Sequence, residues 1–288
     1  MHYGGMDLRI DGRVFLVSGA TRGIGAAVVR TLLAEGACVG GYARRVADEV
    51  DDSRQLIGAA EAADAGQVRA FVDRCAERFG RVDGVVANAG QGLIAGPDAP
   101  LDVWHDQFDQ RITHAKNLID AALPHMRRTD APVIVLLNAV SAHHPDPEMA
   151  PVSAARAALA SYAATLSHHL APDRIRVVSV DLGMIDTDRQ RARHTASQSP
   201  IEYDEWLVDE AVRRGIPWGR AGTRRRSPTS LAREEGGGRQ RGVRCGEQDR
   251  FGTAADRMSK AASIRSGIGM LRFARSATPV RDPGCSST

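Results

Sequence analysis

Lysine is almost absent from this sequence, which contains 38 lysine and arginine residues in total. Only Lys116 and Lys260 are lysines, so a mechanism that requires this side chain has two candidates. Apolar runs of about 18 residues are also absent, which excludes a helix of ordinary hydrophobicity spanning a membrane. Residues 1–11 contain no apolar segment of the kind found in secretory signals, and we therefore expect a cytoplasmic location.

Cysteine is scarce, and its positions give no sign of a metal site or of a disulfide framework. The four cysteines form no CxxC pair and have no histidine nearby at the spacing of zinc ligands. We expect reduced thiols and no bound metal, with the first two cysteines buried as small apolar side chains. The four are Cys38, Cys75, Cys245 and Cys285.

The charge is divided unevenly along the chain. Residues 1–222 contain 24 lysines and arginines against 29 acids, a net charge of −5, whereas residues 223–288 contain 14 against 6, a net charge of +8. The later segment has 13 arginines and 9 glycines with little apolar periodicity. We predict a folded domain over residues 1–222, followed by an atypical basic segment.

Strand-like and helix-like segments alternate over the first two thirds of the chain. Short apolar runs rich in β-branched residues predict six buried strands, over residues 13–18, 37–42, 55–60, 82–88, 132–138 and 176–181. Helical patterns lie between them, over residues 26–35, 64–79, 101–128 and 149–170. This alternation predicts a single-domain, Rossmann-type α/β fold, with a doubly wound parallel sheet between two helical layers.

Three local features are less regular. The third predicted helix contains Pro124 and is expected to bend there. Residues 46–53 are acidic and long enough for at most two helical turns. Residues 184–217 are polar, with one predicted helix around 203–214, and form the expected substrate lid. Two tryptophans in and beside this lid, Trp206 and Trp218, are compatible with an apolar ligand or with core packing.

A glycine-rich turn stands between the first predicted strand and the first helix. It reads SGATRGIG over residues 18–25. Glycines at this place allow a sharp turn and let a pyrophosphate approach the helix N-terminus. The sequence Asn88-Ala89-Gly90 follows the fourth strand, at the edge where an open parallel sheet binds its ligand. The two segments together predict a dinucleotide site.

These motifs resemble those of the short-chain dehydrogenase/reductase family. The resemblance covers residues 8–222 and includes VVANAG at 85–90, ALPHM at 122–126, SAARAAL at 153–159 and VDLGMIDT at 180–187. It implies a Rossmann fold that binds NAD or NADP and moves a hydride to or from a carbonyl or alcohol carbon of a small molecule. The cofactor-binding residues that it implies, together with the arginines discussed next, are Gly19, Thr21, Arg22, Gly23, Ile24, Gly25, Arg44, Arg45, Glu61, Asn88, Ala89, Gly90, Arg156, Gly183 and Thr187.

Arginines near the second strand favour NADP(H) over NAD(H). Family members that prefer NAD have an acid at the end of this strand, where this chain has Ala43. Arg44 and Arg45 follow it, and Arg22 lies in the glycine turn. Guanidinium groups bind a 2′-phosphate better than a hydroxyl, so we predict NADP(H). The alternative is that Arg44 and Arg45 form a solvated surface.

The residues that carry out the family's usual chemistry are replaced. By the resemblance, Ala139 takes the place of the serine, Val152 that of the tyrosine, Arg156 that of the lysine and Arg111 that of an asparagine. No tyrosine in the chain has a lysine or arginine four residues later, so a shifted alignment does not restore the pattern. Because Val152 has no proton to give, ordinary carbonyl reduction by this route is excluded.

The loop after the fifth strand contains residues that can substitute. His143 or His144 can donate a proton near neutral pH, oriented by Asp146 or Glu148. Ser141 lies two residues beyond the lost serine and would face the same side if the strand stayed extended.

Asp181, Arg111 and Arg156 also belong to the expected pocket. Arg156 can still hydrogen-bond the nicotinamide ribose, although not as a lysine does.

Three functional hypotheses stay open at this point. The first is an NADP(H)-binding enzyme of altered or non-redox chemistry, such as a cyclase, lyase or isomerase. The second is an NADPH-dependent carbonyl reductase that takes its proton from His143, His144 or water. The third is a catalytically silent dinucleotide-binding subunit or sensor.

Residues 223–288 lack the final helix and strand that the resemblance implies. Their composition, beginning with RRRSP at 224–228, is typical of a GC-rich gene read out of frame, and a frameshift near codon 223 is our first interpretation. Disorder is the second. A nucleic-acid-binding segment is disfavoured because Phe251 and Phe273 are its only aromatic residues. A homo-oligomer is compatible with the family, although the missing elements would weaken its contacts.

Overall fold

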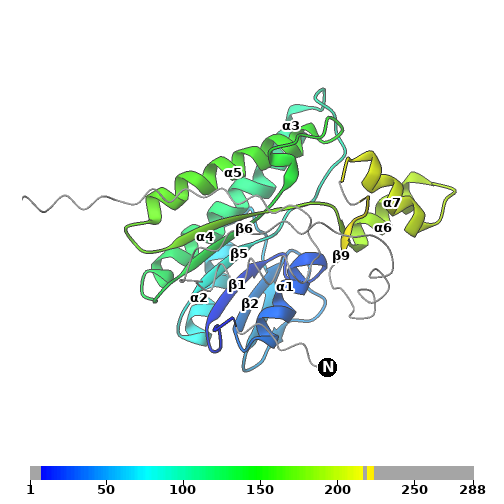
Figure 1. Ribbon diagram of the computed structural model, residues 1–288. Coiled ribbons are helices and arrows are strands. Elements are labelled where there is room, and N and C mark those ends of the chain that lie inside the picture. Colours follow the sequence, from blue (N-terminus) through cyan, green and yellow to red (C-terminus); the bar gives the residue numbers. More distant parts are fainter. Residues whose placement is uncertain (1–7, 217–218, 224–288) are drawn as a thin grey trace, which may run out of the picture.

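Six parallel strands form the centre of the molecule. The computed structural model describes residues 8–216 and 219–223. Within them lies a seven-stranded sheet of order β3-β4-β2-β1-β5-β6-β7 (Figure 1). All six predicted strands are present and parallel, which confirms the doubly wound sheet: β1 (Val14–Ser18), β2 (Cys38–Ala43), β4 (Gln55–Ala59), β5 (Gly84–Ala87), β6 (Val133–Ala139) and β7 (Arg176–Leu182).

Helices cover both faces of this sheet, as Figure 1 shows. They are α1 (Gly23–Ala34), α2 (Ala65–Phe79), α3 (Leu101–Phe108), α4 (His114–Met126) and α5 (Ala150–Leu170). Neighbouring strand residues pack into different cores, since Leu16 joins the cluster beneath α2, α4 and α5, whereas Phe15 and Val17 join the cluster beneath α1. Burial of both sheet faces explains why the strands read as continuous apolar runs.

Local sequence signals at both ends of α2 predict its bounds correctly. The Asp64 side chain accepts a hydrogen bond from the backbone N–H of Gln67 at 3.0 Å, which caps the helix N-terminus. At the other end, Gly80 adopts the left-handed conformation with φ of 76°. Cys75 on this helix is a buried free thiol, as predicted, whereas Cys38 on β2 is partly exposed.

The acidic segment 46–53 contains a strand in place of the expected helical turns. β3 (Val50–Asp51) pairs antiparallel with β4 at the edge of the sheet. The Asp52 side chain accepts hydrogen bonds from the backbone N–H groups of Arg54 and Gln55, at 2.9 and 2.8 Å. This turn reverses the chain and brings Val50 beside Ile57, an effect that helical periodicity does not capture.

The long predicted helix over 101–128 is interrupted, although not at Pro124. A π-helical turn, η1 (Asp109–Thr113), separates α3 from α4, and α4 continues through Pro124 to Met126. Such single wide turns recur at functional sites. Arg111 lies in the middle of this one.

The segment 184–217 contains two helices where one was predicted. α6 (Asp188–Ser197) precedes α7 (Tyr203–Arg213), and the short strands β8 (Ile185–Asp186) and β9 (Gly222–Thr223) pair in parallel. The composition of α6 is so polar that it shows no apolar stripe, which is why the sequence pattern missed it. β9 ends at Thr223, which is the last residue that the structure describes.

Parts of the sequence analysis fall on residues outside the described ranges. These are the basic segment from residue 224, and with it Cys245, Lys260 and Cys285, together with Trp218. No helix within the described ranges is both long and apolar enough to cross a membrane.

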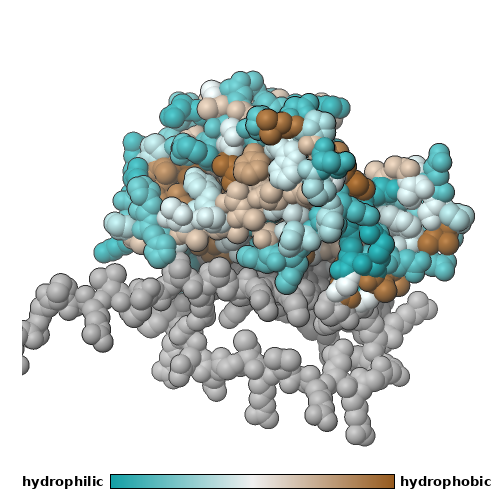
Figure 2. Space-filling model, turned by 90° about the horizontal axis from the view of Figure 1, so that it is seen from above, coloured by the Kyte–Doolittle hydropathy of each residue, from teal (hydrophilic) through white to brown (hydrophobic). Residues whose placement is uncertain are grey.

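One face of the molecule carries apolar side chains at its surface. Leu101 and Phe108 on α3, and Leu93 and Ile94 in the loop before it, are exposed. Figure 2, seen from above, shows a hydrophobic area bordered by hydrophilic residues on the face where α3 and α5 lie in Figure 1. A homo-oligomer stays a prediction.

Candidate functional site

The glycine turn after β1 is shaped for an anion. Gly19 and Gly23 have positive φ values of 62° and 57°. A Cβ atom at Gly25 would overlap the carbonyl oxygen of Gly19, so the turn closes this tightly only with glycine. Arg22 precedes α1 without a side-chain hydrogen bond to its first turn. The backbone N–H groups there are available to a phosphate.

A second turn, after β5, is bound directly to the first. The Asn88 side chain donates hydrogen bonds to the carbonyl oxygens of Ser18 and Gly19, at 3.1 and 3.2 Å. In return, the Ser18 hydroxyl oxygen accepts from the backbone N–H groups of Asn88, at 2.9 Å, and Ala89, at 3.2 Å. Because β1 and β5 are neighbours at the point where the strand order reverses, these turns flank the expected ligand crevice.

Arginines from three elements meet over Gly90 and Gln91. Arg189, in the first turn of α6, donates to the Gly90 carbonyl oxygen at 3.1 Å. The Gln91 amide oxygen, in the orientation that satisfies its neighbours, accepts from Arg22 at 2.8 Å and from Arg44 at 3.3 Å. Among the described residues, no carboxylate forms an ion pair with Arg22, Arg44 or Arg189. Their charge is therefore available to a ligand.

The structure brings two of the three predicted phosphate-binding arginines together, and it adds Arg189. No sequence pattern indicated Arg189, because its position depends on the folding of α6 over the crevice. The other predicted cofactor residues lie at the same edge of the sheet. Ile24 is in α1, and the rest are in the segments that follow β1, β2, β4, β7 and β8: Thr21, Arg45, Glu61, Gly183 and Thr187.

Arg111 is fully buried and fastens the loop after β5. Its guanidinium donates to the carbonyl oxygens of Gln107, at 3.2 Å, and Gln91, at 2.6 Å, and only 1% of the residue is exposed. Burial and the charges of Arg156 and Arg189 lower the pKa of Arg111 to about 9, which leaves it charged at neutral pH. Arg111 therefore serves as a clamp, in the place where the family resemblance implies an asparagine.

Arg156 also points toward backbone acceptors. It donates to the Leu137 carbonyl oxygen on β6 at 2.8 Å. Burial and the charge of Arg189 lower the pKa of Arg156 to about 10, so it too stays charged. Ala139, the last residue of β6, and the buried Val152 supply no side-chain polar atom to this part of the crevice.

His143 and Asp181 form the one histidine–carboxylate pair at this edge within the described residues. The His143 Nε2 atom lies 2.9 Å from Asp181 Oδ2. Parallel pairing of β6 with β7 sets Asp181 opposite Asn138, which places the carboxylate beside the loop that carries His143. The Asp181 side chain is 8% exposed, whereas that of His143 is 47% exposed.

This pair fixes the orientation of the imidazole. An ionised carboxylate only accepts hydrogen bonds, so the hydrogen of neutral His143 is on Nε2. The Nδ1 atom then carries the lone pair and is the nitrogen that can exchange a proton with a bound molecule. The second oxygen of Asp181, Oδ1, is buried and has no hydrogen-bond partner among the described residues.

The other candidates in this loop are placed differently. Asp146 and Glu148, expected to orient a histidine, lie near Arg214 and Arg213 instead, at 3.6 and 3.3 Å. Ser141 lies in the 3-10 turn η2 (Val140–Ala142), because β6 ends at Ala139. The extended strand that would have aligned Ser141 with the lost serine is therefore absent at this point. His144 is exposed.

Helices α6 and α7 are fastened into one unit beside the crevice. Trp206 on α7 packs against the His194 ring of α6, with ring centres 5.3 Å apart. Glu210 accepts hydrogen bonds from Arg193, Arg213 and Arg214. Trp206 thus contributes to packing within the predicted lid.

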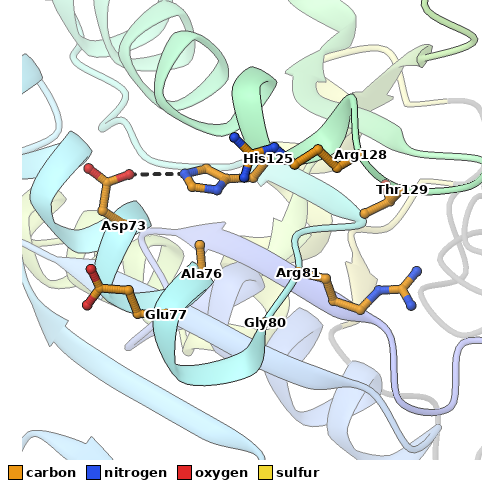
Figure 3. A pocket seen from close by; sticks show the side chains of 8 residues that line it. All are labelled: Asp73, Ala76, Glu77, Gly80, Arg81, His125, Arg128 and Thr129. Atoms are coloured by element: carbon orange, nitrogen blue, oxygen red, sulfur yellow. Dashed lines mark hydrogen bonds and ion pairs between the residues drawn. The ribbon is translucent and has the colours of Figure 1, made fainter.

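A hollow of about 350 Å³ lies at the opposite edge of the sheet (Figure 3). Its lining residues are Asp73, Ala76, Glu77, Gly80, Arg81, His125, Arg128 and Thr129. His125 Nε2 is 3.0 Å from Asp73 Oδ1, and Arg81 is bound by Asp83 and Asp130. The residues that line the hollow lie at the ends of β5 and β6 where these strands begin, away from the turns that follow β1 and β5.

No group of metal-binding side chains occurs among the described residues.

Comparison with known proteins identifies similar sequences. A family model for short chain dehydrogenases matches residues 13–198. Agropine synthesis reductase of Rhizobium rhizogenes is 30% identical over 211 residues, which are 70% of this chain and 49% of that protein. The chain thus spans about half of that relative. An uncharacterized oxidoreductase of Staphylococcus epidermidis is 28% identical over 210 residues, covering 71% of this chain and 91% of the relative.

Solved structures share the same architecture. An apo short chain oxidoreductase of Pseudomonas aeruginosa PAO1 that contains an atypical catalytic center has 27% identity and a TM-score of 0.68, over 75% of this chain and 87% of that one. An NADPH-bound structure from the same organism, also with an atypical center, has 28% identity and a TM-score of 0.66, over 74% and 85%. L-Sorbose reductase of Gluconobacter frateurii, complexed with NADPH and L-sorbose, has 25% identity and a TM-score of 0.70, over 79% and 89%.

Proposed function

This chain belongs to the short-chain dehydrogenase family, and on that premise we propose that it is an NADP(H)-dependent oxidoreductase acting on the carbonyl or alcohol group of a small molecule. The dinucleotide-binding domain spans residues 1–222. His143, held by Asp181, acts in place of the missing tyrosine as the proton donor and acceptor. His144, Ser141 and water are the alternative proton sources.

The His143–Asp181 pair is the observation that carries this proposal. NADPH, when bound, supplies the hydride to the carbonyl carbon. His143, as an imidazolium, donates the proton on Nδ1 to the carbonyl oxygen and is left neutral. Its Nε2–H group keeps its hydrogen bond to the Asp181 carboxylate throughout. In the oxidative direction the same nitrogen accepts the proton of the alcohol. Arg156 and Arg111 hold backbone groups around this reaction space and stay charged throughout.

The crevice fits a phosphorylated dinucleotide. A pyrophosphate fits the uncapped N-terminus of α1 and the close approach of Gly25 to Gly19. A 2′-phosphate fits Arg22 and Arg44, which have no carboxylate partner within the part of the chain that the structure describes. The NADPH-bound structures from Pseudomonas aeruginosa and Gluconobacter frateurii support the choice of NADP(H). Asn88, Ala89 and Gly90 would line the cofactor.

Cofactor preference is tested by titrating the protein with NADPH and with NADH. We expect tighter binding of NADPH, because only this cofactor presents a 2′-phosphate to Arg44 and Arg22. The substitution Arg44→Ala should remove most of the difference, and Arg69→Ala, at an exposed position on α2, should not. Equal affinities for both cofactors in the unsubstituted protein would contradict the NADP(H) assignment.

The proton donor is tested by following NADPH oxidation against a panel of small aldehydes and ketones. His143→Ala should lower kcat by about 10²–10⁴, the range for removal of a positioned general acid. His144→Ala is the neighbouring comparison and should have a much smaller effect, since no buried carboxylate among residues 8–216 and 219–223 orients that ring. Equal effects of the two substitutions would remove His143 from the mechanism.

A non-redox or silent function is the second candidate, favoured by the absence of polar side chains at Ala139 and Val152. It predicts NADPH binding without NADPH oxidation. The same carbonyl panel therefore separates the two candidates.

A further inference from the structure

A buried histidine lies directly beneath the two turns of the dinucleotide site. His114 is the first residue of α4 and is 2% exposed. Its Nε2 atom lies 2.6 Å from the Ser18 hydroxyl oxygen. Ser18 is the last residue of β1, immediately before the glycine turn. The imidazole thus reaches the point where the turns after β1 and β5 are joined.

The direction of each hydrogen bond follows from counting donors and acceptors at Ser18. Its oxygen already accepts from the backbone N–H groups of Asn88 and Ala89, which use both lone pairs. Its single hydrogen has the Val86 carbonyl oxygen at 3.4 Å and His114 Nε2 at 2.6 Å in reach. The Tyr42 phenol on β2, opposite Ser18, also interacts with this hydroxyl. The shorter contact places the hydrogen on the line to His114.

His114 is therefore an acceptor at Nε2, which places its own hydrogen on Nδ1. The backbone carbonyl of Gln110, one turn earlier in the chain, accepts that hydrogen. Burial, with the charges of Arg156 and Arg111, lowers the pKa of His114 to about 4. The ring stays neutral at neutral pH and keeps its accepting lone pair.

We propose that His114 is a positioning residue of the dinucleotide site, acting through Ser18. Because His114 accepts the hydrogen bond from the Ser18 hydroxyl, both lone pairs of the Ser18 oxygen stay directed at the N–H groups of Asn88 and Ala89. Without that acceptor, the hydroxyl turns toward Val86 and the lone pairs leave those N–H groups. The role rests on the proposed function insofar as the molecule to be bound is NADP(H).

The substitutions that test this differ only in the acceptor. His114→Leu fills a similar volume with no acceptor, whereas His114→Gln places an amide oxygen near the position of Nε2. We expect His114→Leu to weaken NADPH binding about three- to tenfold, the effect of one hydrogen bond, and His114→Gln to bind nearly as the unsubstituted protein does. A general structural role would not be rescued by glutamine.

Ser18→Ala completes a double-substitution cycle. If His114 acts through Ser18, the NADPH affinities of His114→Leu, Ser18→Ala and the double variant should be similar, because the second change removes nothing further. The proposal would be overturned if the loss of NADPH affinity in the double variant equalled the product of the losses in the two single variants. So would a His114→Gln protein that binds NADPH as weakly as His114→Leu.

Amide hydrogen exchange provides a readout that needs no cofactor. Exchange at the Asn88 and Ala89 amides should quicken in His114→Leu and stay slow in His114→Gln. If the unsubstituted protein binds neither NADPH nor NADH, the proposed function fails, and this exchange pattern still decides whether His114 orders the turns. Unchanged exchange in His114→Leu would refute the role. Ser18→Ala supplies the same comparison if His114→Leu does not fold.

Discussion

At His143, one neighbouring side chain decides which ring nitrogen can reach a substrate. The buried carboxylate of Asp181 accepts the Nε2 hydrogen at 2.9 Å and leaves Nδ1 directed elsewhere. An amide at position 181 can instead donate to Nε2 and stabilise the other tautomer. The carboxylate is therefore as specific a requirement of the proposed chemistry as the imidazole.

Asp181→Asn should lower kcat by roughly 10- to 100-fold, a part of the 10²–10⁴ that a positioned general acid contributes. The KM for NADPH should change little, because this side chain holds His143 and not the cofactor. Asp146→Asn is the matched control, since Asp146 lies near Arg214 at 3.6 Å. Steady-state kinetics on all three proteins measure both constants. An equal loss in both variants would indicate a general effect of charge.

The sequence indicated His143 but not its partner. Asp146 and Glu148 were the expected orienting residues because they are close in sequence, yet Asp181 is 38 positions away. Its proximity comes from the register of β6 and β7, which pairs Asn138 with Asp181. His114 and Arg189 are not predictable from the sequence for the same reason, because their contacts join segments that only the fold brings together.

At the scale of elements, strands and amphipathic helices were predictable, and polar elements were not. The cap at Asp64 and the glycine at 80 fix α2 from local chemistry alone. The polar helix α6 has no apolar stripe, and its position depends on contacts with α7. Three arginines form ion pairs with one carboxylate, that of Glu210: Arg193 of α6, Arg213 of α7 and Arg214, which follows α7 directly.

Glu210→Gln should loosen the unit formed by α6 and α7. Burial opposes ionisation of Glu210, but hydrogen bonds from Arg213 and Arg214 and the charge of Arg193 lower its pKa to about 2. The carboxylate is therefore charged at neutral pH, and Glu210→Gln replaces this charged acceptor of three guanidinium groups by one neutral amide oxygen. We expect the local free energy of opening to fall by about 2 kcal/mol, the value of a hydrogen bond to a charged group.

Amide exchange across residues 188–213 measures this opening. NADPH should also dissociate faster from the variant, because Arg189 belongs to α6. Asp209→Asn, at an exposed neighbouring position on α7, should leave exchange and dissociation unchanged. Protection that persists in Glu210→Gln would show that aromatic packing around Trp206 holds the unit by itself.

At the scale of the whole molecule, the sheet confines titratable groups to a few buried places. The two cores on its faces are apolar, and the dinucleotide edge carries the buried polar side chains Ser18, Arg111, His114 and Asp181. The sequence predicts an acidic domain over residues 1–222, but it does not indicate which of the charges there are buried. Asp83, before β5, and Glu210, on α7, are buried acids as well.

His114 should make folding sensitive to acid. Its pKa of about 4 in the folded chain lies below the ordinary value of 6.5, so folding favours the neutral ring. The stabilisation is complete above pH 6.5 and is lost as the pH falls toward 4. At about 1.4 kcal/mol for each pKa unit, the free energy of unfolding should drop by about 3 kcal/mol more in the unsubstituted protein than in His114→Gln, between pH 7 and pH 4. Urea denaturation at both pH values measures the difference, and parallel losses in the two proteins would show that His114 already titrates normally.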